Sequence, residues 1–297
     1  MKGLNVTQVA RPTSVEEATE LLDQWGPTSR LVAGNTTIYE MARQGALADV
    51  DKLIDVMGLG LSYIKEDGVV LRIGSTTTFI EMAKSPLLED PSVFVVRETA
   101  RKITPPQVRN MGTIGGAASS GIPFYDMPTS LLAVGARMKV YSKDAGERTI
   151  GVDDFFVDYF VTALSPKDLI TEFEIPFVRN SGSAFVKIGR TAVDFAMVNA
   201  SARVTLDDSK SRIAGARVAI GAVAGRPVRA TATEQVLSGA TITKEKVAEA
   251  AKEAASNIDP TPSVHASANY KKKIIPVAVR DALLASIDRA RTQKSKK

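Results

Sequence analysis

The sequence predicts an α+β protein made of three successive segments. Helix and strand patterns alternate in the first segment, hairpin-like runs mix with helices in the second, and strand-like runs precede two long helical runs in the third. The chain has 297 residues, 44% hydrophobic and 24% charged, which suits one large domain or two to three smaller ones. We expect segments at 1–57, 58–178 and 180–290, followed by a basic tail at 291–297.

The first segment has the pattern of a small α/β unit. Ser14 and Glu17 have the spacing of a capping box that opens a helix, and Gly26 should end that helix. Thr37 and Glu40 predict the cap of a second helix in the same way. Two short apolar runs that predict buried strands lie at 30–33 and 51–56.

The second segment begins with a hairpin signal. Asp67 and Gly68 interrupt an alternating run, as the turn of a hairpin does, and Thr78 with Glu81 opens a helix soon afterwards. The remaining elements that we expect are a helix at 92–103 and strands at 136–142 and 168–177.

The third segment has the pattern of a separate sheet covered by helices. Strand-like runs at 184–190, 201–208 and 216–224 predict a three-stranded sheet. The Ala- and Lys-rich run at 244–257 and the amphipathic run at 276–290 predict helices.

The composition excludes several kinds of chemistry. The chain has no cysteine and one histidine, His265, so it forms no disulfide, ligates no iron–sulfur cluster and offers no zinc site of the usual type. Nucleophilic catalysis assisted by histidine would need His265, which we interpret as a surface or structural residue. The first residues lack the apolar core of a secretory signal, and no run approaches the roughly 20 apolar residues of a membrane span, so we expect a cytoplasmic protein.

The net charge of +5 comes largely from the last third of the chain. Lys271, Lys272 and Lys273 form one basic cluster, and the end of the chain from 289 to 297 forms another. We expect the basic end of the chain to be solvated. No motif for nucleic-acid binding accompanies these charges, so we predict no nucleic-acid partner.

A run of small residues at 110–130, NMGTIGGAASSGIPFYDMPTS, is the strongest local signal for a binding site. Small residues let the backbone approach a ligand and offer it N–H groups, which suits a phosphate. The run matches neither of the common nucleotide motifs, G-x-x-x-x-G-K-[ST] and G-x-G-x-x-G. It contains a single carboxylate, Asp126, which could contact a cofactor or cap the helix that follows.

Four motifs in order resemble the FAD-binding medium subunits of molybdenum hydroxylases, the family of carbon monoxide dehydrogenase, xanthine dehydrogenase and aldehyde oxidoreductase. They are VAGNTTI at 32–38, RNMGTIGG at 109–116 with Asp126 after it, AFVKIGRTAVDFAMVNA at 184–200 and VHASANYKKKIIPVAVRDAL at 264–283. The resemblance covers nearly the whole chain. It implies a two-subdomain FAD-binding region of the PCMH, or vanillyl-alcohol-oxidase, type, with FAD between the subdomains, and then a C-terminal domain like that of the carbon monoxide dehydrogenase flavoprotein.

The resemblance also implies partners. In the family, this subunit works beside a large molybdopterin subunit and a small subunit with two [2Fe–2S] clusters, as a heterohexamer of two three-subunit units. Electrons pass from the molybdenum site through the clusters to FAD and then to an external acceptor. Molybdopterin and the clusters would belong to the partner subunits only.

The family's site residues can be carried over to matching positions. Asp126 should accept hydrogen bonds from the ribose or a nearby group, Lys187 should lie near N1 of the flavin, and Ile103 should lie against the ring system. Phe185 stands where some relatives have a tyrosine over the flavin, and it remains open whether Lys187 is only a strand-surface lysine. The positions implied for FAD binding are Val32, Ala33, Gly34, Asn35, Thr36, Thr37, Ile38, Ile103, Thr113, Ile114, Gly115, Gly116, Ala117, Asp126, Leu169, Ile170, Phe185 and Lys187.

One position departs from the family. Ala117 stands where the second motif usually has Asn, Ser or Asp, so one side-chain hydrogen bond to FAD, worth about 0.5–1.5 kcal/mol, would be absent. Two other functions stay open: a stand-alone flavin reductase of the same superfamily, and a scaffold subunit without flavin. We expect no catalytic acid or base in this chain, because the flavin would supply the redox chemistry.

Overall fold

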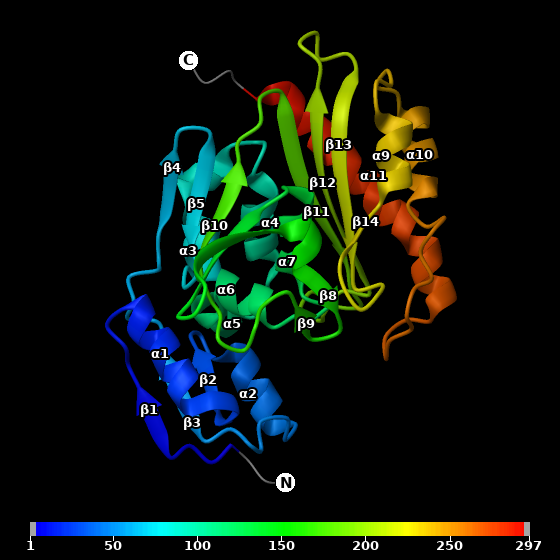
Figure 1. Cartoon of the computed structure of the whole chain (residues 1–297). Coiled ribbons are helices and arrows are strands. Elements are labelled where there is room, and N and C mark those ends of the chain that lie inside the picture. The colour runs from blue at the N-terminus through cyan, green and yellow to red at the C-terminus, as the bar shows by residue number, and fades with distance from the viewer. Residues whose placement is uncertain (1–3, 294–297) are drawn as a thin grey trace.

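The computed structural model describes residues 4–293 and contains three larger sheets that follow one another along the chain (Figure 1). The first is a parallel sheet of order β1-β3-β2. Its segment consists of β1 Gln8–Ala10, α1 Val15–Trp25, the 3-10 turn η1 Gly26–Thr28, β2 Ser29–Val32, α2 Thr36–Arg43 and β3 Lys52–Asp55. The expected helices and the strands β2 and β3 are present, and β1 is an additional strand.

The two helix starts of this segment differ from the sequence prediction. Ser14 caps α1 by accepting a hydrogen bond from the N–H of Glu17, but the Glu17 carboxylate accepts from the N–H of Thr13, not of Ser14. The prediction that Thr37 caps α2 is wrong. The helix begins at Thr36 after Asn35, which is left-handed at φ 59° and makes no side-chain cap, so Thr37 lies inside the first turn and its hydroxyl bonds to Tyr125.

The second segment is a five-stranded antiparallel sheet, β4-β5-β10-β6-β7, with helices on one face (Figure 1). Its hairpin turn and the capping box of Thr78 and Glu81 lie where the sequence predicts them. The elements are β4 Ile64–Asp67, β5 Val70–Gly74, α3 Phe79–Lys84, η2 Pro86–Glu89, α4 Phe94–Lys102, α5 Pro106–Met111, α6 Ile114–Ser119, α7 Asp126–Ala133, β6 Arg137–Ser142, β7 Gly146–Gly151, α8 Val152–Phe155, the small hairpin β8 Phe156–Asp158 and β9 Val161–Thr162, and β10 Leu169–Pro176.

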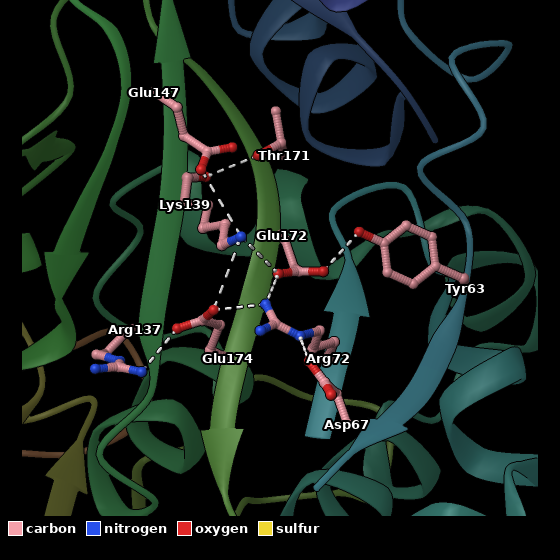
Figure 2. Close-up of polar contacts among 9 residues, drawn as sticks. All are labelled: Tyr63, Asp67, Arg72, Arg137, Lys139, Glu147, Thr171, Glu172 and Glu174. Carbon is pink, nitrogen blue, oxygen red and sulfur yellow. Dashed lines mark hydrogen bonds and ion pairs between the residues drawn. The ribbon is translucent and has the colours of Figure 1, made fainter. Parts of the chain in front are cut away.

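The two faces of the five-stranded sheet differ in character. Alternate residues such as Leu71 and Phe173 point into the core beneath the helices. The opposite face carries a network of charged side chains, drawn in Figure 2, in which Arg72 reaches both Glu172 and Glu174 at 2.6 Å. The Tyr63 hydroxyl donates to Glu172 at 2.8 Å, and burial together with this bond raises the pKa of Tyr63 to about 12.

The third segment is a four-stranded sheet, so the expected three strands are joined by the two-residue strand β14. This sheet lies between α4 and α7 on one face and α9, α10 and α11 on the other (Figure 1). The elements are β11 Ser181–Ile188, β12 Val198–Leu206, β13 Ile213–Gly221, β14 Val228–Arg229, α9 Thr231–Leu237, α10 Lys244–Glu253 and α11 Ala268–Thr292.

Only the first residues of the expected basic tail at 291–297 are described by the structure. Helix α11 runs to Thr292, and residues 294–297 lie outside the described residues. Lys271, from the other basic cluster, is buried in the first turn of α11. Within residues 4–293, no helix combines the length and the apolar character that crossing a membrane requires.

Candidate flavin-binding site

The first two sequence motifs meet where α2 and α5 approach each other. The Cα of Gly34 lies against the backbone of Met111, and a Cβ at this position would come within 1.6 Å of the Met111 carbonyl oxygen. Glycine is therefore required here by contact between two protein backbones. The Thr37 hydroxyl adds a second link between the subdomains, 3.0 Å from the hydroxyl of Tyr125.

The start of α2 offers free hydrogen-bond donors. Within the part of the chain that the structure describes, the backbone N–H groups of Thr36, Thr37 and Ile38 have no acceptor, and Tyr39 is the first residue of the helix to donate, to the Asn35 carbonyl. Unpaired N–H groups and the positive end of the helix dipole both favour an anion. The residues present at this motif therefore fit the pyrophosphate of FAD.

The second motif is built differently. Residues 114–117 form the first turn of α6, and their N–H groups already donate within the protein, to Thr77, Ser75 and Thr113. Gly115 packs against Ser75, whereas a Cβ on Gly116 would meet only the Thr113 hydroxyl, at 3.1 Å. This segment therefore presents a closely approachable surface at Gly116, with its N–H groups already paired.

Asp126, Lys187 and Asn199 form a buried polar cluster beside these motifs. Lys187 Nζ donates to one Asp126 carboxylate oxygen and Asn199 Nδ2 donates to the other, both at 2.9 Å. Asp126 is the first residue of α7 and Tyr125 precedes it as the cap residue, so the alternative that Asp126 caps the helix is wrong. Burial raises the pKa of Asp126, and Lys187 and Asn199 oppose that rise by favouring the carboxylate.

Three aromatic rings next to Asp126 were missed by the sequence analysis. The rings of Phe124, Tyr125 and Phe195 contact one another. The Phe195 ring centre lies 4.8 Å from that of Phe124 and 5.9 Å from that of Tyr125, and Phe195 is about half exposed. The aromatic pair in PFYD was the available signal for Phe124 and Tyr125. Nothing local in the sequence linked Phe195 to them, because it lies in the loop between β11 and β12.

Comparison with known proteins agrees with this architecture. Residues 5–178 match the family model of the FAD binding domain in molybdopterin dehydrogenase, and residues 183–286 match the CO dehydrogenase flavoprotein C-terminal domain. The chain belongs to this family of FAD-binding medium subunits.

Individual relatives are similar over nearly their whole length. The carbon monoxide dehydrogenase medium chain of Hydrogenophaga pseudoflava is 32% identical, covering 93% of this chain and 95% of that one. The 6-hydroxypseudooxynicotine dehydrogenase complex subunit alpha of Paenarthrobacter nicotinovorans is 30% identical, covering 95% and 94%. A solved structure of the carbon monoxide dehydrogenase from Hydrogenophaga pseudoflava superposes with a TM-score of 0.91 at 31% identity, covering 97% of this chain and 99% of that one. The protein is thus the FAD subunit of a molybdenum-containing oxidoreductase and the medium chain of a multi-subunit complex.

The remaining expected contact positions of this medium subunit lie at varying depth. Ile103 ends α4, half-buried, and its carbonyl accepts a hydrogen bond from Arg109. Leu169 and Ile170 are buried in β10, where only their backbone could reach a cofactor. Phe185 is 1% exposed and packs into the core of the second segment, which argues against a direct flavin contact by its ring. Val32, at the end of β2, and Ala117, in α6, are also buried.

Other features of the medium subunit do not compete with this site. Within residues 4–293, no group of three or more histidine or acidic side chains could hold a metal ion. A cavity of about 380 Å³ lies between α7 and the loop before α9, remote from the two motifs in the fold. Among the charged residues that line it, Asp153 pairs with Arg229, and Arg226 donates to the Phe156 carbonyl.

Proposed function

We propose that this chain binds one FAD between its first and second segments and passes electrons from the iron–sulfur clusters of a partner subunit to an external acceptor. The observation that carries the proposal is the start of α2, with three unpaired N–H groups, held beside the second motif by the contact of Gly34 with Met111. The three segments, with boundaries near 57 and 179, are proposed as two halves of the flavin site and a C-terminal domain that completes it.

The residues of this chain would bind and orient FAD. The N–H groups of Thr36, Thr37 and Ile38 would receive the pyrophosphate, and Asp126 would accept from a hydroxyl of the ribose or ribityl chain. Lys187 pairs with Asp126, so the two would act toward FAD as a single dipolar unit. When bound, FAD would supply the redox chemistry by accepting and donating electrons.

Exposed apolar side chains near the site support the proposal of partner subunits. Met111 lies at the Gly34 contact, Phe195 covers Tyr125, and Phe160 donates its N–H to the Gly121 carbonyl in the loop before Asp126. Exposed apolar groups gathered around one site are typical of a surface that another protein covers. We propose a large molybdopterin subunit and a small iron–sulfur subunit as the partners, in a heterohexamer.

The proposal is tested by purifying the chain with the subunits that accompany it and identifying any released flavin. We expect FAD at close to one per chain, together with molybdenum- and iron-bearing partners. A colourless protein that refuses added FAD would remove the electron-transfer role and leave the scaffold function. FAD on a chain without partners would favour a stand-alone flavin reductase.

A further inference from the structure

The C-terminal sheet places three residues in one row beneath the start of α7. Lys187 on β11, Asn199 on β12 and Gly221 on β13 are direct neighbours across the strands. Cross-strand neighbours point to the same face of a sheet, so Lys187 and Asn199 approach Asp126 together. The other face of β12, with Val198 and Ala200, packs against α11 and its neighbours.

The orientation of the Asn199 amide is fixed by a third partner. The Thr129 hydroxyl, one turn along α7 from Asp126, donates to Asn199 Oδ1 at 2.8 Å. Because Oδ1 accepts this bond, the Nδ2 amide group is directed at Asp126 Oδ1 at 2.9 Å. Asn199 is completely buried, so these bonds face no competition from water.

Gly221 leaves the space that this arrangement needs. A Cβ at residue 221 would lie 2.1 Å from the Thr129 hydroxyl and 2.4 Å from Asn199 Oδ1. Any larger residue would displace the bond between Thr129 and Asn199. Gly221 does not have a positive φ, so the need for glycine here comes from the neighbouring hydrogen bond and not from the backbone conformation.

We propose that Asn199 is a positioning residue for FAD binding, which holds Asp126 ionised and oriented so that its free lone pairs can accept from the cofactor. The inference rests on the proposed FAD site. It extends that site to the C-terminal domain, because Lys187 and Asn199 together supply one donor to each carboxylate oxygen. The charged groups that act on Asp126 are Lys187 on β11 and, from farther away, Lys102 at the end of α4.

The test measures FAD affinity against pH for the assembled protein after its flavin has been removed. In Asn199→Leu, the loss of the amide donor disfavours the carboxylate, so Asp126 takes up a proton more readily. We expect FAD affinity to fall about ten-fold or more near neutral pH, which corresponds to one hydrogen bond to a charged group. The loss should grow as the pH is lowered, because protonated Asp126 no longer accepts with both oxygens.

A matched control lies two residues away on the same face of β12. The buried Ser201 hydroxyl bonds to Ser130 of α7 but not to Asp126, so Ser201→Ala should keep FAD affinity and its pH dependence close to those of the unmodified chain. Thr129→Val frees the Asn199 amide without changing side-chain size, and it should shift the pH dependence in the same direction by a smaller factor. If Asn199→Leu does not fold, Thr129→Val is the variant that tests the role of Asn199.

Two results would overturn the inference and leave the proposed function intact. One is an affinity for FAD that is unchanged in both Asn199→Leu and Thr129→Val at every pH. The other is a pH-independent loss that Ser201→Ala shares, which would indicate a general weakening of the contact between α7 and the sheet. If the unmodified chain binds no FAD, the proposed function and the inference fail together.

Discussion

Three consecutive lysines differ in exposure in the folded chain: Lys271 is buried, whereas Lys272 and Lys273 are exposed. Lys271 is 3% exposed, and its ammonium donates to the Ala222 carbonyl at 2.7 Å. Burial lowers the pKa of Lys271, since desolvation disfavours the charged form. Nothing in the sequence YKKKI distinguishes this lysine from the two that follow it.

Lys271 should make stability depend on pH. The pKa of Lys271 is lower in the folded than in the unfolded chain. Its contribution to the free energy of unfolding is therefore present above the unfolded pKa of about 10.4, and it is lost as the pH falls through the folded pKa. Lys271→Met removes this dependence. In thermal unfolding, we expect the melting temperature of the unmodified chain to rise relative to that of Lys271→Met as the pH rises from about 7 toward 10.

The exposed Lys273→Met variant is the control for Lys271→Met and should track the unmodified chain at each pH. A difference between the unmodified chain and Lys271→Met that stays constant with pH would contradict the expected titration.

Among the elements, the hairpin of β4 and β5 and the capping box at Thr78 were confirmed, whereas the box at Ser14 formed only in part and the box at Thr37 was wrong. The box at Thr78 formed as predicted, while the similar sequence at Thr37 produced a helix whose N–H groups stay free. Thr78 is the residue just before its helix, whereas α2 already begins at Thr36, so Thr37 lies inside the first turn and its hydroxyl bonds to Tyr125 of another segment.

The outer face of the five-stranded sheet depends on Arg72 as its central cation (Figure 2). Glu172 and Glu174 are each 7% exposed. Arg72→Met would leave Glu172 with the Tyr63 hydroxyl and Lys139, and Glu174 with Lys139 and the more exposed Arg137. Because Arg72 itself is partly exposed, we expect the free energy of unfolding to fall by about 1–3 kcal/mol. Denaturant unfolding measures this loss.

The neighbouring Lys65→Met is the control for Arg72→Met. Its ammonium lies 4.6 Å from the centre of the Tyr63 ring and is exposed, so its loss should cost about 0.5 kcal/mol or less. Equal stability of the two variants would show that the network does not depend on Arg72.

At the scale of the whole molecule, one ion pair ties α11 back to the second segment. Arg289 donates to both oxygens of Glu98 on α4 at 2.8 and 2.9 Å, and to the Ser183 carbonyl at 2.7 Å. Burial by itself would raise the pKa of Glu98, but Arg289 and the N–H of Phe185 hold it below its usual value. The contribution of this pair is therefore present above pH about 4.3 and is lost as pH falls through the lowered value.

Arg289→Leu should accordingly destabilise the chain at neutral pH by about 1–3 kcal/mol and loosen the C-terminal domain. In thermal unfolding and limited proteolysis, the difference from the unmodified chain should shrink below pH about 4.3. Arg291→Leu, an exposed arginine in the same last turn, should behave like the unmodified chain. Undiminished destabilisation in acid would assign the effect to packing of Arg289 on Phe94 instead.

The family and most of the long helices and strands were predictable from the sequence alone. Those features depend on neighbours a few residues apart, such as Thr78 with Glu81 or the alternation along β12. It also singled out Asp126 and Lys187, though as separate candidates. The added strands β1, β7 and β14 are short or polar, and tertiary pairing decided them.

Only the tertiary structure decided which polar groups share one site and which lysine is buried. Lys187 and Asn199 are 61 and 73 residues from Asp126 along the chain, and no local pattern in the sequence indicates that two strands and one helix bring them together. Burial and hydrogen-bond partners are properties of packing, so the charge state of Asp126, the free N–H groups of α2 and the need for glycine at 221 followed from the fold.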